Sequence, residues 1–205
     1  MTIRYLSLAA IWFLCAVPPG MATEEAPYTV LQKDGDFELR QYEPHIVAET
    51  VVEGDFSAVG NVGFRRLFDY ISGNNRRKQE IAMTAPVSQE ASSQKIAMTA
   101  PVGQEQVAGK WRVTFMMPTE YTLDTLPEPL NFDVTLREVP GRLIAAIRYS
   151  GPWGQARYQT HEDQLQVWIE DNQLVAVGPP IFARYNSPFM IWFLRRNEVL
   201  IPVQK

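Results

Sequence analysis

Few side chains in this 205-residue sequence are of the types that do acid–base, nucleophilic or metal chemistry. There are two histidines, His45 and His161, and a single cysteine, Cys15. A zinc site with three protein ligands would need carboxylates at ligand spacing beside the histidines, and no such spacing is found. The sequence also lacks a Gly-x-Ser-x-Gly elbow, a Walker loop and a His-Glu-x-x-His pair. These absences favour a binding protein over an enzyme, so we expect no catalytic residues.

The composition indicates one folded globular domain. Hydrophobic residues make up 46% of the chain and charged residues 20%, which is enough apolar material for one core. The formal net charge is −4, so no basic field directs the chain toward nucleic acid. We therefore expect no nucleic-acid partner.

The N-terminal residues predict a secretory signal. Arg4 precedes a weakly polar to apolar run at residues 5–17, and the small residues Gly20 and Ala22 follow. The run is shorter than the ~20 residues that span a bilayer. We expect residues 1–22 to be removed, leaving a periplasmic or secreted chain, 23–205, without a membrane span; an uncleaved anchor is the alternative. Because Cys15 lies in this run, the mature chain would have neither a disulfide nor a thiolate.

The elements that must position the histidines begin with two strands and a helix. Apolar and polar residues alternate over 36–42, which predicts a half-buried strand, and Glu43-Pro44 predicts a turn. His45 then starts a second strand over 45–52, on the face that carries Val47. A helix is predicted next, because apolar residues recur at helical spacing at Phe64, Leu67, Phe68 and Ile71.

The same order returns later in the chain. Strands are predicted at 134–139 and 143–149, and a helix follows with His161 on its apolar face. Aligned without gaps, Phe37 falls on Val134, and the turns, glycine stops and helices coincide. We infer an internal duplication, with repeats at about 36–117 and 131–204. Neither unit can bury a sheet face alone, so we expect an α+β fold in which one curved antiparallel sheet carries both helices.

A doubled run of seven residues follows the helix of the first repeat. Ile-Ala-Met-Thr-Ala-Pro-Val occurs at 81–87 and again at 96–102, around a polar loop, which predicts a hairpin. One interpretation is that the hairpin only extends the sheet. The other is that Met83 and Met98 belong to a deformable apolar wall of a ligand groove.

Several motifs in one order carry a family resemblance. They are residues 37–44, the helix at 63–75, the Met-Thr-Ala-Pro-Val motif, residues 111–118, and the stretch from Arg184 to Val199. On these the sequence resembles the SOUL haem-binding family, bacterial branch, over about 28–203. The resemblance implies a distorted β-barrel of two related halves flanked by two helices. It also implies a haem or tetrapyrrole ligand, held for transport, buffering or sequestration.

The resemblance directs attention to particular ligand-binding residues. Some animal members of the family have a proposed iron ligand where this chain has Gln41, and an amide is a poor ligand for haem iron. As axial ligand we rank His161 first and His45 second; the alternatives are a packing histidine and a solvent-side histidine. An apolar ring surface could instead come from the first helix, with arginines for the propionates. These helix candidates are Phe64, Leu67, Phe68, Ile71, Arg65 and Arg66, which core packing and a solvated face would also explain.

Three other functions stay open at this point. The chain could bind a different small hydrophobic molecule, act as an enzyme on a tetrapyrrole, or dock the hairpin on a partner strand.

Overall fold

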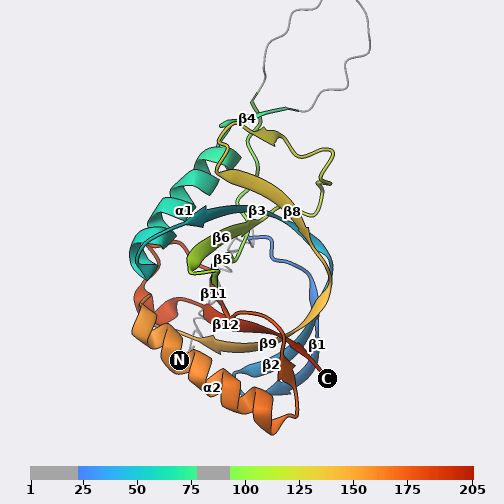
Figure 1. Ribbon diagram of the computed structural model, residues 1–205, viewed down its shortest axis with the longest axis vertical. Helices are drawn as coiled ribbons and strands as arrows, with labels where there is room; N and C mark the ends of the chain where they lie inside the picture. Colours follow the sequence, from blue (N-terminus) through green and yellow to red (C-terminus); the bar gives the residue numbers. More distant parts are fainter. Residues whose placement is uncertain (1–22, 78–92) are drawn as a thin grey trace, which may run out of the picture.

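The computed structural model describes residues 23–77 and 93–205 (Figure 1). Three helical segments are present in this part of the chain: α1 (Phe56–Ile71), α2 (Gln155–Asp171) and the short 3-10 helix η1 (Trp192–Leu194). The strands are β1 (Tyr28–Asp34), β2 (Phe37–Tyr42), β3 (His45–Val52), β4 (Asn75–Arg76), β5 (Val102–Val107), β6 (Lys110–Met116), β7 (Glu128–Pro129), β8 (Val134–Val139), β9 (Arg142–Tyr149), β10 (Val175–Ala176), β11 (Ile181–Arg184) and β12 (Asn197–Gln204).

One strongly curved antiparallel sheet forms the body of the molecule. Its strands follow the order β1-β2-β9-β12-β11-β5-β6-β3-β8, with β10 added beside β12. The α+β class is as expected, but the barrel is not formed. Closure would require hydrogen bonds between the first and last strands, whereas β1 pairs only with β2 and β8 only with β3. The sheet is therefore an open ring, as Figure 1 shows.

The strands of each predicted half pair with strands of the other half. Phe37 of β2 lies opposite Ile147 of β9, and Val134 of β8 lies opposite Thr50 of β3. Under the ungapped alignment of Phe37 with Val134 these two pairs are equivalent. The register is therefore symmetric in the way that a duplication would produce, although the duplication itself stays a prediction.

Glycine ends the strand before each long helix. Gly54, after β3, has a φ of 132°, and Gly151, after β9, has a φ of 129°. Such values are strained for residues with a Cβ atom, so glycine is the residue that lets the chain leave the sheet and start a helix here.

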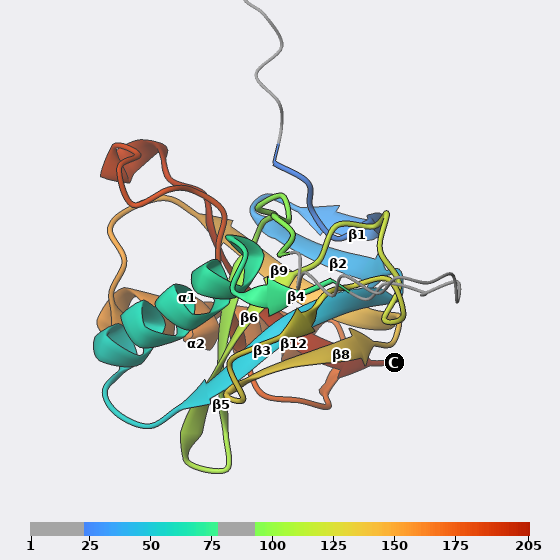
Figure 2. The ribbon, with the colours of Figure 1, turned by 90° about the horizontal axis from the view of Figure 1, so that it is seen from above.

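Both helices cover the outer face of the sheet (Figures 1 and 2). Helix α1 buries Leu67 and Ile71 in a core with Val113 and Phe115 of β6. Helix α2 contributes the second core, where Tyr158, Leu165, Trp168 and Ile169 pack with residues of β2, β9, β11 and β12. The inner face of the ring is left free of helices, and among the described residues it carries the third core cluster.

The doubled run in the middle of the chain was predicted to form a hairpin. The first copy of the doubled run, with Met83, lies outside the described residues. The second copy does not form the expected strand: only Val102 belongs to β5, and Ala100 makes an isolated parallel bridge with Glu25. Ile96 instead donates its backbone N–H to the Ile71 carbonyl at the end of α1, 2.8 Å away. The run is therefore held against the helix rather than in the sheet.

Candidate functional site

The inner face of the curved sheet encloses a small cavity. Its volume is about 90 Å³, and strands of both halves line it. Apolar side chains such as Val47 and Met116 form much of the wall, and Arg137 and Arg142 bring positive charge to it. Small-molecule pockets usually measure about 300–1,000 Å³, so this cavity as it stands is too small for a haem.

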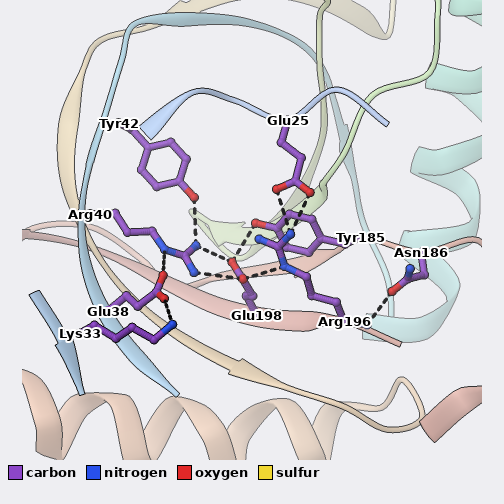
Figure 3. A network of polar contacts seen from close by, with 9 residues as sticks. All are labelled: Glu25, Lys33, Glu38, Arg40, Tyr42, Tyr185, Asn186, Arg196 and Glu198. Atoms are coloured by element: carbon purple, nitrogen blue, oxygen red, sulfur yellow. Dashed lines mark hydrogen bonds and ion pairs between the residues drawn. The ribbon is translucent and has the colours of Figure 1, made fainter. Parts of the chain in front are cut away.

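A buried ionic network adjoins this cavity (Figure 3). The carboxylate of Glu198, fully buried on β12, accepts hydrogen bonds from both terminal nitrogens of Arg40 on β2, at 2.6 and 3.1 Å. It also accepts bonds from Arg196 Nε at 3.0 Å and from the Tyr185 hydroxyl at 2.8 Å. Burial by itself lowers the pKa of Arg40, but the bonds to Glu198 and its charge outweigh burial and raise it. The network locks β2, β11 and β12 together.

His45 lies at this inner face and lines the cavity. Its Nδ1 is 3.0 Å from the Glu43 carbonyl oxygen, which can only accept, so Nδ1 carries the proton. Burial lowers the pKa of His45, and the charges of Arg142 and Arg137 lower it further, while the bond to Glu43 opposes them. The ring is therefore held in the neutral form, with Nε2 as its acceptor.

His161 lies at a different place and lines a wide surface groove between α2, the β1–β2 turn and the C-terminal end of β9. The groove has a volume of about 780 Å³ and is bounded on its apolar side by Phe37, Ile147, Tyr149 and Val167. His161 stacks on Tyr149, with ring centroids 3.7 Å apart and planes inclined by 12°. Its Nδ1 is 2.7 Å from the Arg157 carbonyl oxygen one turn earlier. Nδ1 is therefore the donor, and Nε2 points outward in the ring plane, where stacking does not cover it.

The polar groups of this groove set its charge. Arg148, exposed on β9, is the cation among the lining residues, and Asp34 and Asp36 supply carboxylates at the β1–β2 turn. The Tyr149 hydroxyl is buried and has no hydrogen-bond partner among the described residues. Burial raises the pKa of Tyr149 above its ordinary value, so the phenol stays protonated as an unpaired donor.

The candidates on the first helix divide between core and surface. Leu67 and Ile71 are buried at 0% and 4% exposure, and burying such a side chain contributes about 1.5–3 kcal/mol to stability. A ligand could not reach them without disturbing that packing. Phe64 and Phe68 stack on each other, and Phe68 is 45% exposed, so these two form the accessible apolar part of α1.

The two arginines of α1 also differ. Arg66 is held by an ion pair with Asp133 at 3.1 Å and by a bond to the Thr50 hydroxyl at 3.2 Å. Arg65 is exposed. Met98 is 39% exposed on the extended segment that crosses the end of α1. None of the α1 candidates lines the groove that contains His161, so the sequence-based candidates do not form one site among the described residues.

Sequence reasoning missed most of the groove. Phe37, Tyr149 and Val167 were assigned to strands or a helix without a binding role, and the signal for them was only their nearness to His161 in the predicted elements. The Glu198–Arg40 pair was missed as well. A charged residue at an inward position of an apolar strand was the available signal.

The comparisons with known proteins decide the family. A sequence model of the family described as SOUL heme-binding protein matches residues 23–202, nearly the whole described chain. The chain belongs to the SOUL heme-binding protein family. Human heme-binding protein 2 is 25% identical over 186 residues, covering 85% of each chain. Heme-binding protein 1 of Xenopus laevis is 23% identical over 175 residues, covering 81% of this chain and 87% of its own.

Solved structures share the fold of this SOUL family member. The C-terminal domain of EcmrR has a TM-score of 0.58 at 12% identity, covering 87% of this chain and 98% of that domain. An uncharacterized conserved protein from Listeria innocua has a TM-score of 0.56 at 12% identity, covering 82% and 92%. At this identity the likeness shows the fold alone.

Membership in the SOUL family supports haem as a ligand, and the groove beside His161 fits that group better than the inner cavity does. Its volume lies within the range of small-molecule sites, one wall is apolar, and the His161 imidazole is present with its Nδ1 bonded to a backbone carbonyl. In addition, no helix within residues 23–77 and 93–205 is long and apolar enough to cross a membrane, and these residues contain no cluster of three or more metal-ligating side chains.

Proposed function

We propose that this SOUL family protein binds haem or a related tetrapyrrole in the groove between α2, the β1–β2 turn and the C-terminal end of β9, with His161 as axial ligand. The observation that carries the proposal is the hydrogen bond from His161 Nδ1 to the Arg157 carbonyl, 2.7 Å long. Metal-bound histidines commonly donate their second ring nitrogen to a carbonyl or carboxylate, which fixes the tautomer and leaves the other nitrogen for the metal. Here that arrangement exists before any ligand is bound.

The rest of the groove offers apolar contacts for the porphyrin ring and a cation for its propionates. Phe37, Ile147 and Val167 offer apolar contact for the ring. Arg148 can pair with a propionate, whereas Asp34 and Asp36 would repel one, so the propionates should lie toward Arg148 and solvent. Bound haem would supply an iron centre with its own absorption. We infer that the protein transports, buffers or sequesters this ligand rather than acting on it as an enzyme.

A hemin titration followed at the Soret band tests this site. The protein should give a saturable one-to-one change. His161→Ala should shift the band and weaken affinity at least about tenfold, a loss that removing even an outer-shell partner of a metal site can cause. His45→Ala is the matched control, since it removes the other histidine from the inner cavity and should leave the titration unchanged.

Two results would count against the proposal. Unchanged affinity and an unchanged band position in His161→Ala would show that His161 is not the axial ligand. Weakening in His45→Ala alone would move the site to the inner cavity, which would then have to open around the ligand.

The proposal includes the localisation of the protein. A positive start, a short apolar run and the small residues Gly20 and Ala22 support export and cleavage, and hence a periplasmic or secreted haem-binding protein. The first residue of the purified, exported protein, read by Edman degradation, should be Thr23; a chain that still begins at Met1 would refute cleavage.

A further inference from the structure

The loop between β11 and β12 exposes six consecutive apolar side chains. Residues 189–194 read Phe-Met-Ile-Trp-Phe-Leu, and all are solvent-exposed, from 39% at Met190 to 95% at Phe189. The loop, which contains η1, stands away from the body of the molecule at the upper left of Figure 2. Single exposed apolar residues are common, but a contiguous patch of this kind marks a surface that is covered by something else.

Arg195 and the 3-10 turn hold this loop in its projecting shape. Arg195 donates from Nε to the Met190 carbonyl at 2.9 Å and from a terminal nitrogen to the Pro188 carbonyl at 2.7 Å. Leu194 donates its N–H to the Ile191 carbonyl at 3.0 Å. These bonds fix the loop in a conformation in which all six apolar side chains are exposed.

The charge around the loop suits a phospholipid surface. The chain contains no Asp or Glu between Gly178 and Arg196. Arg195 lies at the base of the loop, where its guanidinium also stacks over Trp153 at 4.4 Å. The loop therefore offers an apolar tip, with Trp and Phe rings typical of membrane interfaces, and a cation behind it.

The N-terminal end of the described chain lies beside this loop. Glu25 accepts hydrogen bonds from Arg196 at 2.8 and 3.0 Å, directly after the loop, and both the first described residues and the loop lie at the top of Figure 2. The loop is therefore tied at its C-terminal end to the first described residues.

We propose that residues 189–194 insert into the interface of a phospholipid bilayer and hold the protein at a membrane surface. The occupant of the loop is lipid: the aromatic and aliphatic side chains enter the boundary between headgroups and acyl chains, and Arg195 pairs with lipid phosphate. The contact is peripheral, does not depend on the proposed haem site, and needs no spanning helix.

Vesicle sedimentation tests membrane binding by the loop. It uses the whole protein as purified from the producing cell. Phosphatidylcholine vesicles with and without phosphatidylglycerol serve as the probe. Phe189→Ser/Trp192→Ser should lower the partition coefficient about tenfold or more, because two large apolar side chains leave the interface. Phe132→Ser is the matched control, since Phe132 is fully exposed on the loop before β8 and should have no effect. Equal binding of the loop variant and the control would overturn the proposal.

Fluorescence quenching gives a readout that is specific to the loop. Lipids brominated near the headgroup end of the acyl chain should quench Trp192, and Trp192→Phe should remove that quenching while vesicle binding is largely kept. Absence of quenching in a vesicle-bound protein would overturn the proposal. So would a loop variant that binds vesicles normally but loses self-association in sedimentation velocity, because the loop would then contact a second copy.

Discussion

Single side chains in this protein show how burial decides chemical role. His45 and His161 both bond a backbone carbonyl through Nδ1, yet one lines a small cavity and the other a wide groove. Glu198 and Arg40, in contrast, neutralise each other inside the sheet. The residue type alone therefore does not identify a site; the space next to the free atom does.

At the residue scale, we predict that His45 makes the fold sensitive to acid. Burial lowers its pKa in the folded state below the unfolded value of about 6.5. The unfolded chain then binds a proton more readily, so the stability from neutral His45 is present above about pH 6.5 and is lost as pH falls below it. Urea unfolding at pH 7, 6 and 5 should show a smaller decrease in His45→Gln than in wild type. Parallel decreases would show that His45 does not contribute.

Glu198 should be the most costly charged residue to remove. Glu198→Ala leaves Arg40, 2% exposed, with Glu38 as its remaining counter-ion, and breaking such a buried pair costs about 3–5 kcal/mol. Thermal and urea unfolding measure the loss. Glu138→Ala, at an exposed position on β8, is the control and should change stability by less than about 0.5 kcal/mol. A Glu198→Ala effect as small as the control would show that the network is not stabilising.

At the scale of elements, sequence patterns located strands well where one face is buried. β2, β3, β8 and β9 alternate clearly and are bounded by turns or glycines, and their predicted ranges agree with the structure within a residue. β1 was missed because almost all its side chains are exposed, so burial imposes no alternation. The α1 and α2 helices were found from their apolar spacing, although α1 begins earlier than expected, at Phe56.

The contact of α1 with the sheet depends on one small residue. A Cβ atom at Gly63 would lie 2.5 Å from a Val113 methyl group on β6. Gly63→Ala should therefore destabilise the protein by about 1–3 kcal/mol through overpacking, despite the better helix propensity of alanine. Asn61→Ala, at an exposed position of the same helix, is the control and should be neutral or slightly stabilising. A stabilised Gly63→Ala would mean that α1 shifts outward freely.

At the scale of the whole molecule, the pairing between halves could not be predicted from sequence. Hydrophobic alternation tells which face of a strand is buried but not which strand lies beside it. Glu43-Pro44 predicted a turn between β2 and β3 but not their partners, and in the structure β2 pairs with β9 and β3 with β8. The open ring and both candidate cavities follow from this strand pairing between the halves, since strands or helices far apart in sequence line each cavity.

The strand pairing between the halves predicts how the protein unfolds. A chain of residues 23–117 alone would leave β2 without β9 and β3 without β8, exposing strand edges and the apolar faces that the other half covers. The same holds for residues 131–205, so neither fragment should give the dispersed amide NMR spectrum of a folded domain. The intact chain should unfold in one transition, with far-UV circular dichroism and tryptophan fluorescence coinciding. A folded fragment, or two separate transitions, would show that the halves are independent units and that the cross-pairing is not what holds the sheet together.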